Sequence, residues 1–355
     1  MRVIMAGGGT GGHLFPGLAV ARALKERNDM VEILFVGSAR GIESRVLPRA
    51  GFPLETLPIR GLTGRGARGV AEALVGVPAS VARALKIIRR FGPDFVLGLG
   101  GYASGPMLLA ASLRRIPCAI MEQNLRPGLT NRLLGRCARR IFVAYEETRA
   151  FFSSPRVIVS GNPVRWRELP QVPRSEKFTL FIFGGSAGAH KINLCALEAL
   201  AALSDLAPAW RIIHQTGEAD FAWVAQAYRK LSFAAEVFPF IEKMDEAYAA
   251  ADLIVCRAGA TTIAELTAYG KPAVLVPYPF AAHDHQRWNA EALTRQGAAE
   301  MILDRELSGP RLAETLRALY RDRDKIASMA AQARKLGKPE AADTIAEECL
   351  KLAAR

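Results

Sequence analysis

The sequence predicts an α/β protein built from two similar, Rossmann-like domains, each a parallel sheet with helices on both faces. Short apolar strands alternate with helical patterns through both halves of the 355 residues, and this alternation is typical of parallel sheets covered by helices. Each half also opens with a strand that runs into glycines, at Gly7 to Gly12 and at Gly184 to Ala189. Because ligands of open parallel sheets bind beyond the carboxyl ends of the strands, we expect the two sheets to face each other across a cleft.

Eight apolar segments are the clearest candidates for buried strands. They cover residues 31–36, 95–99, 118–121, 140–143, 178–183, 211–214, 253–255 and 273–276. Helical spacing of apolar residues lies between them, as over residues 70–91, where Pro78 is expected to divide two helices. From Pro310 onward the pattern is helical.

A polar, proline-containing segment separates the two halves. Residues 161–165 and the following 168–177 have the composition of a linker. We therefore expect an N-terminal domain over residues 1–162 and a C-terminal domain over residues 163–338. A last helix over residues 339–355 could pack on either domain.

All of the net positive charge lies in the first half. Residues 1–162 hold 23 Lys and Arg against 10 Asp and Glu, whereas residues 163–355 hold 24 of each, which leaves the net charge of +13 in the first half. Such a field favours an anionic partner, either nucleic acid or acidic lipid headgroups. Residues 70–91 carry cations between apolar residues, which suits a helix packed on the sheet or a shallow membrane contact. Nucleic acid is disfavoured, because aromatic residues for base stacking are absent there.

Other classes of protein are disfavoured by the cysteines and by the hydropathy. The five cysteines are scattered without Cys-x-x-Cys spacing, so we expect neither a disulfide framework nor a zinc site, as suits the cytosol. The chain enters a strand directly, and we expect no signal peptide. The uncharged residues 95–113 are interrupted by glycines and Pro106, which favours strand, loop and helix over a membrane span.

The glycines after the first strand predict an anion site. Glycine allows a sharp turn that leaves amide N–H groups open, and the N-terminus of the helix that follows favours negative charge. The spacing Gly7, Gly9, Gly12 also fits a dinucleotide-binding fingerprint, but Gly37 and Ser38 stand where that fingerprint needs a carboxylate. His13 opens the helix, either as a capping or packing residue or as a functional imidazole.

Two segments of the second half have the residue types of a nucleotide-sugar site. Arg257 to Leu266 follows a strand and opens a helix, so its glycine and threonines could hold a phosphate while Glu265 holds a ribose. The alternative is an ordinary capped helix with a surface glutamate. Gln286 and Asn289 share a helical face suited to sugar hydroxyls. A metal at His283, Asp284 and His285, or at Asp322 and Asp324, and a Ser-His-Asp triad are weaker alternatives.

Taken together, the motifs resemble the MurG family of bacterial N-acetylglucosaminyltransferases. The matching pieces run in the family's order along the chain. They are Gly8 to His13, Gly100 to Pro106, Glu122 to Asn124, Gly161 to Arg165, Gly184 to Ser186, Arg257 to Glu265, and His285, Gln286 and Asn289. The resemblance implies the GT-B fold, with an acceptor-binding and membrane-facing N-terminal domain, a UDP-sugar-binding C-terminal domain, and a last helix that returns to the N-terminal domain.

The resemblance also implies an activity and a location. The expected reaction moves N-acetylglucosamine from UDP-GlcNAc, with inversion, to the C4 hydroxyl of undecaprenyl-diphosphate-linked N-acetylmuramoyl-pentapeptide in peptidoglycan synthesis. The expected place is the cytoplasmic face of the bacterial inner membrane, as a peripheral protein on an anionic surface. No metal motif is evident, so we expect no required cofactor; a loosely bound divalent cation is the alternative.

Site residues follow from the resemblance position by position. His13 is the candidate base and Glu122 the second. Asn124, Arg165, Gln286 and Asn289 would border the donor, Glu265 would hold the ribose, and the backbone of Ile241 the uracil. The expected diphosphate-binding residues are Ser186, Gly259, Ala260, Thr261 and Thr262, continued by Ile263 and Ala264. The expected acceptor-side residues are Thr10, Gly11, Gly12, Gly101, Tyr102 and Ser104.

Three departures from the family pattern leave alternatives open. Met121 replaces a histidine, Ala187 a glutamine and Ala258 a serine, so an acid–base role is lost at the first and a polar donor contact is in doubt at the second. Another glycolipid glycosyltransferase, a UDP-sugar epimerase and a non-catalytic nucleotide-sugar sensor share the expected architecture. The basic first half favours the lipid acceptor over the last two.

Overall fold

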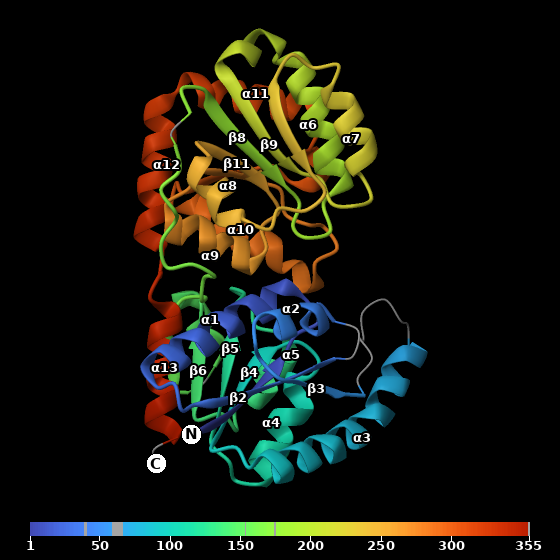
Figure 1. Ribbon diagram of the computed structural model, residues 1–355, viewed down its shortest axis with the longest axis vertical. Helices are drawn as coiled ribbons and strands as arrows, with labels where there is room; N and C mark the ends of the chain where they lie inside the picture. Colours follow the sequence, from blue (N-terminus) through green and yellow to red (C-terminus); the bar gives the residue numbers. More distant parts are fainter. Residues whose placement is uncertain (39–40, 59–66, 153, 174, 354–355) are drawn as a thin grey trace. The chain divides into compact units, whose positions relative to one another are not determined.

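The chain folds into two units. The computed structural model describes residues 1–355 except 39–40, 59–66, 153, 174 and 354–355, and except the side chains of 67–75 and 283 (Figure 1). Unit 1 comprises Met1–Arg165 and Lys338–Arg355, and unit 2 comprises Trp166–Gly337. The sequence placed the first boundary after Asn162, and the structure places it after Arg165.

Unit 1 is built on one parallel sheet of seven strands. Their order is β3-β2-β1-β4-β5-β6-β7, so consecutive strands run outward from β1 and then, after a crossover, outward from β4. The pairing of β1 with β4 is irregular at its end, because Ala6 pairs with Gly98 whereas Gly7 pairs with Gly100. The strands are β1 (Arg2–Gly7), β2 (Glu32–Ser38), β3 (Leu54–Leu57), β4 (Phe95–Gly100), β5 (Cys118–Glu122), β6 (Arg140–Val143) and β7 (Val157–Val159).

Helices cover both faces of this sheet. Val3 and Met5 pack with α1 and α13 on one face, while Ile4 and Ala6 pack with α3 and α4 on the other. This alternation follows from the period of two of a strand. The helices are α1 (Gly11–Arg27), α2 (Glu43–Arg49), α3 (Ala67–Phe91), α4 (Ser104–Leu113), α5 (Leu129–Leu134) and α13 (Ala341–Ala353), with the 3₁₀ helix η1 (Glu146–Phe151).

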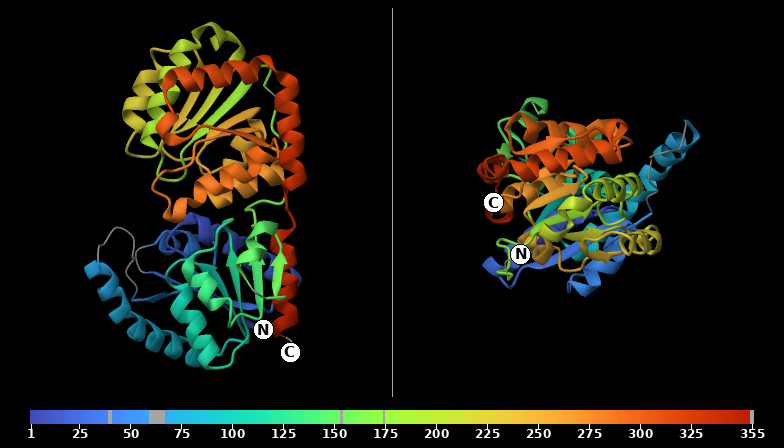
Figure 2. Two further views of the ribbon diagram at one scale, coloured as in Figure 1. Left: turned by 180° about the vertical axis from the view of Figure 1, so that it is seen from behind. Right: turned by 90° about the horizontal axis from the view of Figure 1, so that it is seen from above.

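The last helix, α13, belongs to unit 1 and lies beside α1 (Figures 1 and 2). Its apolar residues Ile345 and Cys349 are fully buried in the core that α1 shares. An ion pair joins Arg27 of α1 to Asp343. The segment from Ala341 therefore completes a core whose other members come from the start of the chain.

The expected break at Pro78 is wrong, because α3 runs through it from Ala67 to Phe91. A proline within a helix removes one backbone hydrogen bond but need not end the helix. Pro78 is exposed, and the hydroxyl of Ser80 adds a hydrogen bond to the carbonyl oxygen of Gly76 at 2.9 Å. The added bond and the packing of Ile87 and Ile88 against the sheet favour one continuous helix.

Unit 2 repeats the strand order of unit 1. Its six parallel strands lie in the order β10-β9-β8-β11-β12-β13, so the crossover falls between β8 and β11 as it falls between β1 and β4 in unit 1. The strands are β8 (Phe178–Phe183), β9 (Trp210–Gln215), β10 (Ala234–Phe238), β11 (Leu253–Cys256), β12 (Ala273–Leu275) and β13 (Ala299–Met301).

Helices also cover both faces of the second sheet. Leu180 and Ile182 pack with α6, α7 and α11, while the rings of Phe181 and Phe183 pack against Tyr248 of α8. The elements are α6 (His190–Ala202), α7 (Phe221–Tyr228), α8 (Met244–Ala250), α9 (Ala260–Tyr269), α10 (His285–Arg295), α11 (Gly309–Arg321) and α12 (Arg323–Leu336), with the 3₁₀ helices η2 (Ser204–Ala209), η3 (Ala282–Asp284) and η4 (Asp304–Glu306).

Candidate functional site

Each unit places a glycine loop where its strand order reverses. In unit 1 the loop after β1 meets the end of β4, and in unit 2 the loop after β8 lies beside the end of β11. In open α/β sheets, ligands bind outside the carboxyl ends of the strands at this switch point. The topology therefore gives each unit one candidate site.

His13 lies in the first turn of α1, at the switch point of unit 1. The carbonyl oxygen of Thr10, the N-cap residue, accepts from the backbone N–H groups of His13 and Leu14 at 3.3 and 3.2 Å. The ring of His13 is half-buried, and its Nδ1 lies 3.2 Å from Oε1 of Gln123. The Gln123 side chain in turn donates from Nε2 to the carbonyl oxygen of Leu99 at 2.7 Å. The imidazole is thus held in place rather than mobile on the surface.

A buried carboxylate, Glu43, supports the same loop. Its Oε2 accepts from the backbone N–H of Gly9 at 2.9 Å, and its Oε1 accepts from the N–H and hydroxyl of Ser38 at 2.8 and 2.9 Å. Glu43 is fully buried. A side chain of this protein therefore takes up a loop N–H that the dinucleotide alternative would assign to a cofactor.

Glu122, the second candidate base, organises the loop after β5. Among the described residues its carboxylate accepts from its own loop: Oε1 from the N–H and side-chain amide of Asn124 at 3.0 and 3.3 Å, and Oε2 from the N–H of Gly128 and the amide of Asn131 at 3.0 and 2.9 Å. Burial raises the pKa of the Glu122 carboxyl, against these hydrogen bonds, which lower it. This geometry gives Glu122 and Asn124 a structural role in the loop. Met121, the departure beside them, is buried in the core.

The N-terminus of α4 forms the other wall of the unit 1 site. Gly101 precedes it with φ of +76°, and Tyr102 is 40% exposed. The hydroxyl of Ser104 is buried without a hydrogen-bond partner among the described residues. A Cβ at Gly98 would lie 2.6 Å from this hydroxyl oxygen, so the Ser104 side chain is covered by β4.

Arg165 ends unit 1 close to the start of α1. Its guanidinium carbon lies 4.8 Å from the ring centroid of Phe15, a distance at which cation and ring attract each other.

In unit 2 the loop after β8 packs against the loop after β9. Gly188 has φ of +79°, and a Cβ on it would collide with the carbonyl oxygen of Thr216, so only glycine fits there. Ser186 and Ala187 at the tip are exposed. The loop thus presents Ser186 from a tightly packed base.

The residues expected to hold the diphosphate open α9. Gly259 is its N-cap, and the N–H of Ile263 donates to the Gly259 carbonyl oxygen at 2.9 Å. Thr261, Thr262 and Ala264 are half-buried and Ile263 is buried. Alignment of N–H groups at a helix start of this length favours an anion.

Glu265 is buried, which excludes the alternative of a surface glutamate. Its side chain belongs to α9, and its Oε2 accepts from the hydroxyl of Tyr248 at 2.9 Å. Asn289, also fully buried, lies beside the same loop and donates to the carbonyl oxygen of Ala258 at 3.4 Å. Gln286 is half-buried and accepts from the N–H of Tyr278 at 3.0 Å.

The backbone of Ile241 is partly engaged by a side chain. Its N–H donates to Oε1 of Gln215 at 2.9 Å, and Gln215 donates from Nε2 to the carbonyl oxygen of Gly185 at 2.9 Å. A cavity of about 630 Å³ opens at Ile241 and is also lined by Phe238 and Phe240. Gln215 thus links the glycine loop to the segment expected to hold the uracil.

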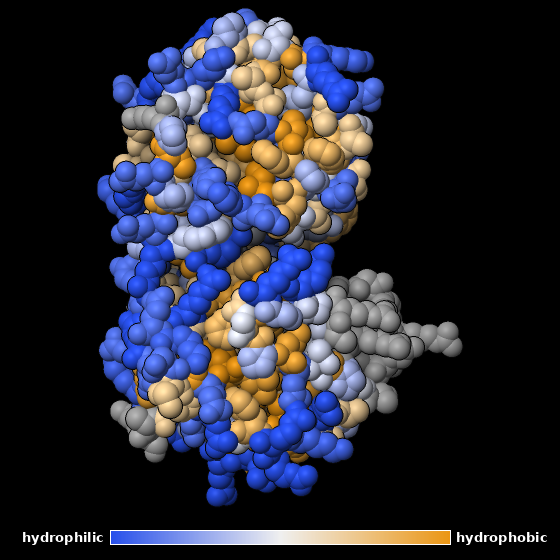
Figure 3. Space-filling view, in the orientation of Figure 1, coloured by the Kyte–Doolittle hydropathy of each residue, from blue (hydrophilic) through white to orange (hydrophobic). Residues whose placement is uncertain are grey.

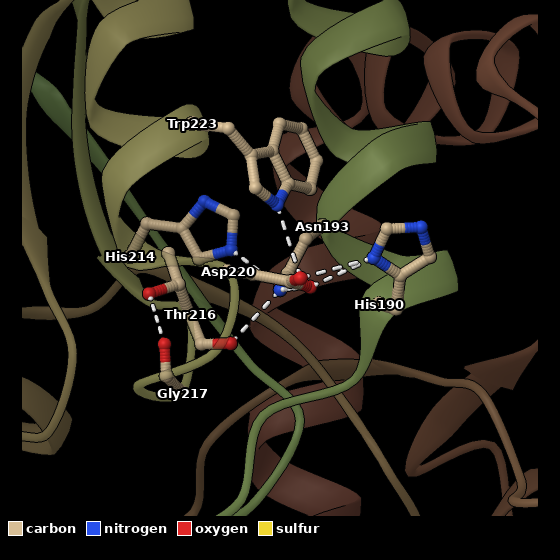
Figure 4. A network of polar contacts seen from close by, with 7 residues as sticks. All are labelled: His190, Asn193, His214, Thr216, Gly217, Asp220 and Trp223. Atoms are coloured by element: carbon tan, nitrogen blue, oxygen red, sulfur yellow. Dashed lines mark hydrogen bonds and ion pairs between the residues drawn. The ribbon is translucent and has the colours of Figure 1, made fainter.

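A polar network stabilises the loop after β9 in unit 2 (Figure 4). The sequence pattern did not indicate this network. Asp220 accepts from Trp223 Nε1 at 3.0 Å and Asn193 Nδ2 at 2.8 Å, and it contacts His190 Nδ1 at 3.0 Å. Burial acts to raise the pKa of Asp220, but these hydrogen bonds outweigh it and the pKa is lowered. Asn193 also donates to the carbonyl oxygen of Thr216 at 2.9 Å, so the network ties α6 to the loop after β9.

Within the part of the chain that the structure describes, no group of three or more His, Cys, Asp and Glu side chains is placed to hold a metal ion. Asp322 instead caps α12, accepting from the N–H of Lys325 at 2.9 Å. No helix among the described residues is long and apolar enough to cross a membrane.

The apolar residues of α3 expected to meet a membrane are only partly buried, and Val77 among them is 42% exposed. On α3, Val81 and Leu85 pack against the core and Ile88 lies within it, whereas Val70 and Leu74 lie outside the described side chains. The structure instead exposes a leucine patch on α4 and α5, on the same side of the sheet. The leucine patch consists of Leu109, Leu113, Leu129 and Leu133.

Exposed arginines follow the leucines of this patch closely along the chain. Arg114, Arg115, Arg126, Arg132 and Arg136 are exposed, and the one acidic residue between 104 and 136 is the buried Glu122. The space-filling view shows hydrophobic areas interrupted by hydrophilic ones on the face of unit 1 that it displays (Figure 3).

Comparisons with known proteins cover nearly the whole chain. Residues 3–143 match the glycosyltransferase family 28 N-terminal domain, and residues 179–345 match the family 28 C-terminal domain. Two curated relatives are named UDP-N-acetylglucosamine–N-acetylmuramyl-(pentapeptide) pyrophosphoryl-undecaprenol N-acetylglucosamine transferase. The one from Myxococcus xanthus is 48% identical over 99% of this chain and 93% of its own length. The one from Geobacter metallireducens is 49% identical over 99% and 98%.

Solved structures agree with this. MurG from Acinetobacter baumannii matches with a TM-score of 0.81 at 32% identity, covering 99% of each chain. A UDP-GlcNAc 2-epimerase from Neisseria meningitidis, solved with UDP-GlcNAc, matches with a TM-score of 0.68 at 18% identity, covering 99% of this chain and all (100%) of its own. The second likeness concerns the fold alone.

Proposed function

The chain belongs to the MurG family within glycosyltransferase family 28, and from this premise we infer that it transfers N-acetylglucosamine from UDP-GlcNAc to undecaprenyl-diphosphate-linked N-acetylmuramoyl-pentapeptide. It is thus an N-acetylglucosaminyltransferase of the GT-B fold that acts in peptidoglycan synthesis. The observation that carries this assignment is that the similarity to these relatives extends over nearly the whole chain, including both switch-point loops.

The reaction joins the C4 oxygen of the acceptor sugar to C1 of N-acetylglucosamine with inversion. The bond from C1 to the diphosphate oxygen breaks, UDP leaves, and a base takes the proton of the C4 hydroxyl. We assign the base to His13, whose ring is held at the switch point of unit 1. Glu122 is less suited, because both of its oxygens already accept hydrogen bonds from its own loop. A positioned base typically contributes about 10² to 10⁴ in rate.

The donor is assigned to unit 2. The start of α9, from Gly259 to Ala264, would stabilise the diphosphate and its charge as UDP leaves, together with Ser186. Glu265 would accept from the ribose hydroxyls, and its burial beside Tyr248 supports a fixed carboxylate. The carbonyl of Ile241 suits N3–H of uracil, with Phe240 lining the same cavity. Gln286, Asn289, Asn124 and Arg165 are proposed to border the sugar nucleotide.

The acceptor is assigned to unit 1. The first turn of α1, with Thr10, Gly11 and Gly12, would face the acceptor diphosphate or sugar, since N–H groups at a helix start favour an anion. Gly101, Tyr102 and Ser104 at the start of α4 complete this side.

An anionic membrane surface is the proposed partner of unit 1. The leucine patch and the arginines close to it along the chain combine apolar burial with attraction to acidic headgroups, which is the chemistry of a peripheral contact. The proposed location is the cytoplasmic face of the bacterial inner membrane, where the lipid acceptor is met.

We propose that no metal ion is required. The helix start at α9 supplies positive potential that a cation would otherwise supply, and Ala187 and Ala258, two departures from the family pattern, add no metal ligand. Calorimetry of UDP binding with and without a chelator tests this, and loss of binding with the chelator would contradict it.

The assignment is tested by supplying UDP-GlcNAc with and without a lipid-linked muramoyl acceptor. We expect disaccharide-linked lipid and UDP only when the acceptor is present. Isomerised sugar without acceptor would instead indicate an epimerase, and binding without turnover a sensor. Turnover only with a different lipid-linked sugar would indicate another glycolipid glycosyltransferase.

A further inference from the structure

Gln123 connects three elements at the switch point of unit 1. It follows β5, is 2% exposed, and reaches past the end of β4 to the first turn of α1. Its Nε2 donates to the carbonyl oxygen of Leu99 at 2.7 Å, and its Oε1 lies 3.2 Å from Nδ1 of His13. The carbonyl oxygen of Leu99 is a partner that can act only as an acceptor.

That partner fixes which way the amide points. A carbonyl oxygen can only accept a hydrogen bond, so the atom 2.7 Å from it must be the NH₂ nitrogen of Gln123. If the amide were flipped, two oxygens without hydrogens would stand in contact inside the protein. The oxygen of Gln123 therefore faces His13.

The orientation of the amide determines where His13 carries its proton. An amide oxygen accepts only, so Nδ1 of His13 must donate to it, and in the neutral ring the lone pair then resides on Nε2. We infer that Gln123 is a positioning residue that holds His13 in the Nδ1–H tautomer and so makes Nε2 the nitrogen that can take a proton. The tautomer follows from the hydrogen bonds alone, whereas its consequence for the reaction rests on the proposed role of His13 as the base.

Gly100 makes room for this arrangement. A Cβ at Gly100 would lie 2.7 Å from Nδ1 of His13, and the residue has φ of +94°. Both the space and the backbone conformation therefore call for glycine. The imidazole is seated between the end of β4 and the amide of Gln123.

The fully buried His214 provides an internal reference of the opposite tautomer. The amide nitrogen of Asn193 donates to Thr216 and Asp220, so its oxygen faces Nε2 of His214, 3.1 Å away. Nε2 of His214 must therefore carry the hydrogen, and Nδ1 accepts from the hydroxyl of Tyr228 at 2.9 Å. His13 and His214 thus hold opposite tautomers, each set by an amide.

Nitrogen NMR of the histidine-labelled full chain tests the inference, because the two ring nitrogens differ in chemical shift according to which one carries hydrogen. The His13 signals are identified by their loss in His13→Ala, and those of His214 by their loss in His214→Gln. We expect His13 with hydrogen on Nδ1 and His214 with hydrogen on Nε2. Hydrogen on Nε2 of His13, or an even mixture, would overturn the inference without any variant of Gln123.

Gln123→Met tests the consequence for catalysis, since methionine keeps the length and burial but has no amide. We expect the His13 tautomers to mix and kcat to fall about ten-fold or more, with the KM for UDP-GlcNAc nearly unchanged. In the His13→Ala background, Gln123→Met should not lower kcat any further, because Gln123 acts through His13. A full additional loss in that background would overturn the inference.

Gln215→Met is the matched control. Gln215 is likewise 2% exposed, and it donates to a backbone carbonyl in the loop after β8, but it belongs to unit 2. It should alter UDP binding and leave the His13 signals unchanged. If the tautomer is found as expected but His13→Ala retains its rate, the proposed base is wrong while the assignment of the tautomer stands.

Discussion

Oε2 of Glu43 accepts a hydrogen bond from the backbone N–H of Gly9 at 2.9 Å, so the glycine loop that precedes His13 is anchored by a carboxylate from α2. The other oxygen of Glu43 accepts from Ser38 at the end of β2. Side chains at Gly8, Gly37 or Gly41 would collide with Glu43. One acidic side chain thus fills the space that the glycines leave and sets the shape of the loop.

Replacement of Glu43 by glutamine should destabilise unit 1. The amide NH₂ cannot accept, so the N–H of Gly9 or of Ser38 loses a partly buried hydrogen bond to a charged acceptor, at a cost of roughly 1–3 kcal/mol. Faster hydrogen exchange at both amides and a lower urea midpoint would show the effect. Ser38→Ala, which removes only a hydroxyl donor, is the control and should cost less. Unchanged exchange at Gly9 would contradict the anchoring role.

His13→Ala should lower kcat by about 10² to 10⁴ and leave the affinity for UDP nearly unchanged. The reason is that the proposed base acts on the acceptor hydroxyl, whereas the proposed UDP site lies in unit 2. Initial rates with the lipid-linked acceptor and calorimetry with UDP measure the two quantities. A rate within a few-fold of wild type would remove His13 from the mechanism.

Glu265→Gln should weaken UDP binding by about ten- to one-hundred-fold, because a hydrogen bond to a charged acceptor contributes roughly 1.5–3 kcal/mol. Calorimetry compares it with Tyr248→Phe, which removes the hydroxyl that donates to Glu265 but keeps the carboxylate. We expect the second variant to lose stability and retain most of its affinity for UDP. Equal affinity of wild type and Glu265→Gln would exclude the ribose contact.

Substitution of Leu129 and Leu133 by serine should reduce binding to vesicles of acidic lipid. These side chains are 63% and 57% exposed, so they contribute little to folding and, in the proposal, insert between headgroups. Sedimentation at low salt measures the bound fraction, which should also fall as salt screens the arginines. Leu194→Ser is a matched control in unit 2, where the leucine is 43% exposed. An equal loss in both variants would argue against the leucine patch.

Acid should destabilise unit 2 through His214. Burial lowers the pKa of this histidine from 6.5 to about 3, so the unfolded chain binds the proton more readily than the folded one. Its contribution is fully present above about pH 6.5 and is lost as the pH falls toward about 3, with roughly 2 kcal/mol lost by about pH 5. Urea unfolding of wild type and His214→Gln should therefore differ in pH dependence over this window. Parallel pH profiles would contradict the assignment.

The central strands could be predicted from the sequence because they are buried on both faces. Segments 140–143 and 178–183 agree with β6 and β8, and the others differ from the observed strands by one or two residues at one or both ends. The four strands missed, β3, β7, β10 and β13, are the four sheet edges. Edge strands are short and half-buried, as the alternately exposed residues of β10 show, so their apolar pattern is weak.

For the candidate sites too, the features formed by contiguous residues could be predicted, whereas those formed by residues far apart in the sequence could not. A strand, a glycine turn and a helix start are contiguous, so the loops at Gly7 and Gly259 could be predicted. The contacts of Glu43, Gln123 and Gln215 could not, because each pairs residues from different strand ends that only the sheet order brings together. The sequence also did not reveal that Glu122 accepts hydrogen bonds from Asn124 and the rest of its own loop, because residue spacing does not predict such contacts.

Because α13 completes the core beside α1, unit 1 is made of two stretches of chain separated by the whole of unit 2. During synthesis, unit 2 can finish folding while unit 1 still exposes the apolar groove that Ile345 and Cys349 will fill. The nascent protein therefore exposes an apolar, aggregation-prone surface until residues 341–353 leave the ribosome. Premature termination anywhere in unit 2 would yield a fragment prone to aggregate or to be degraded.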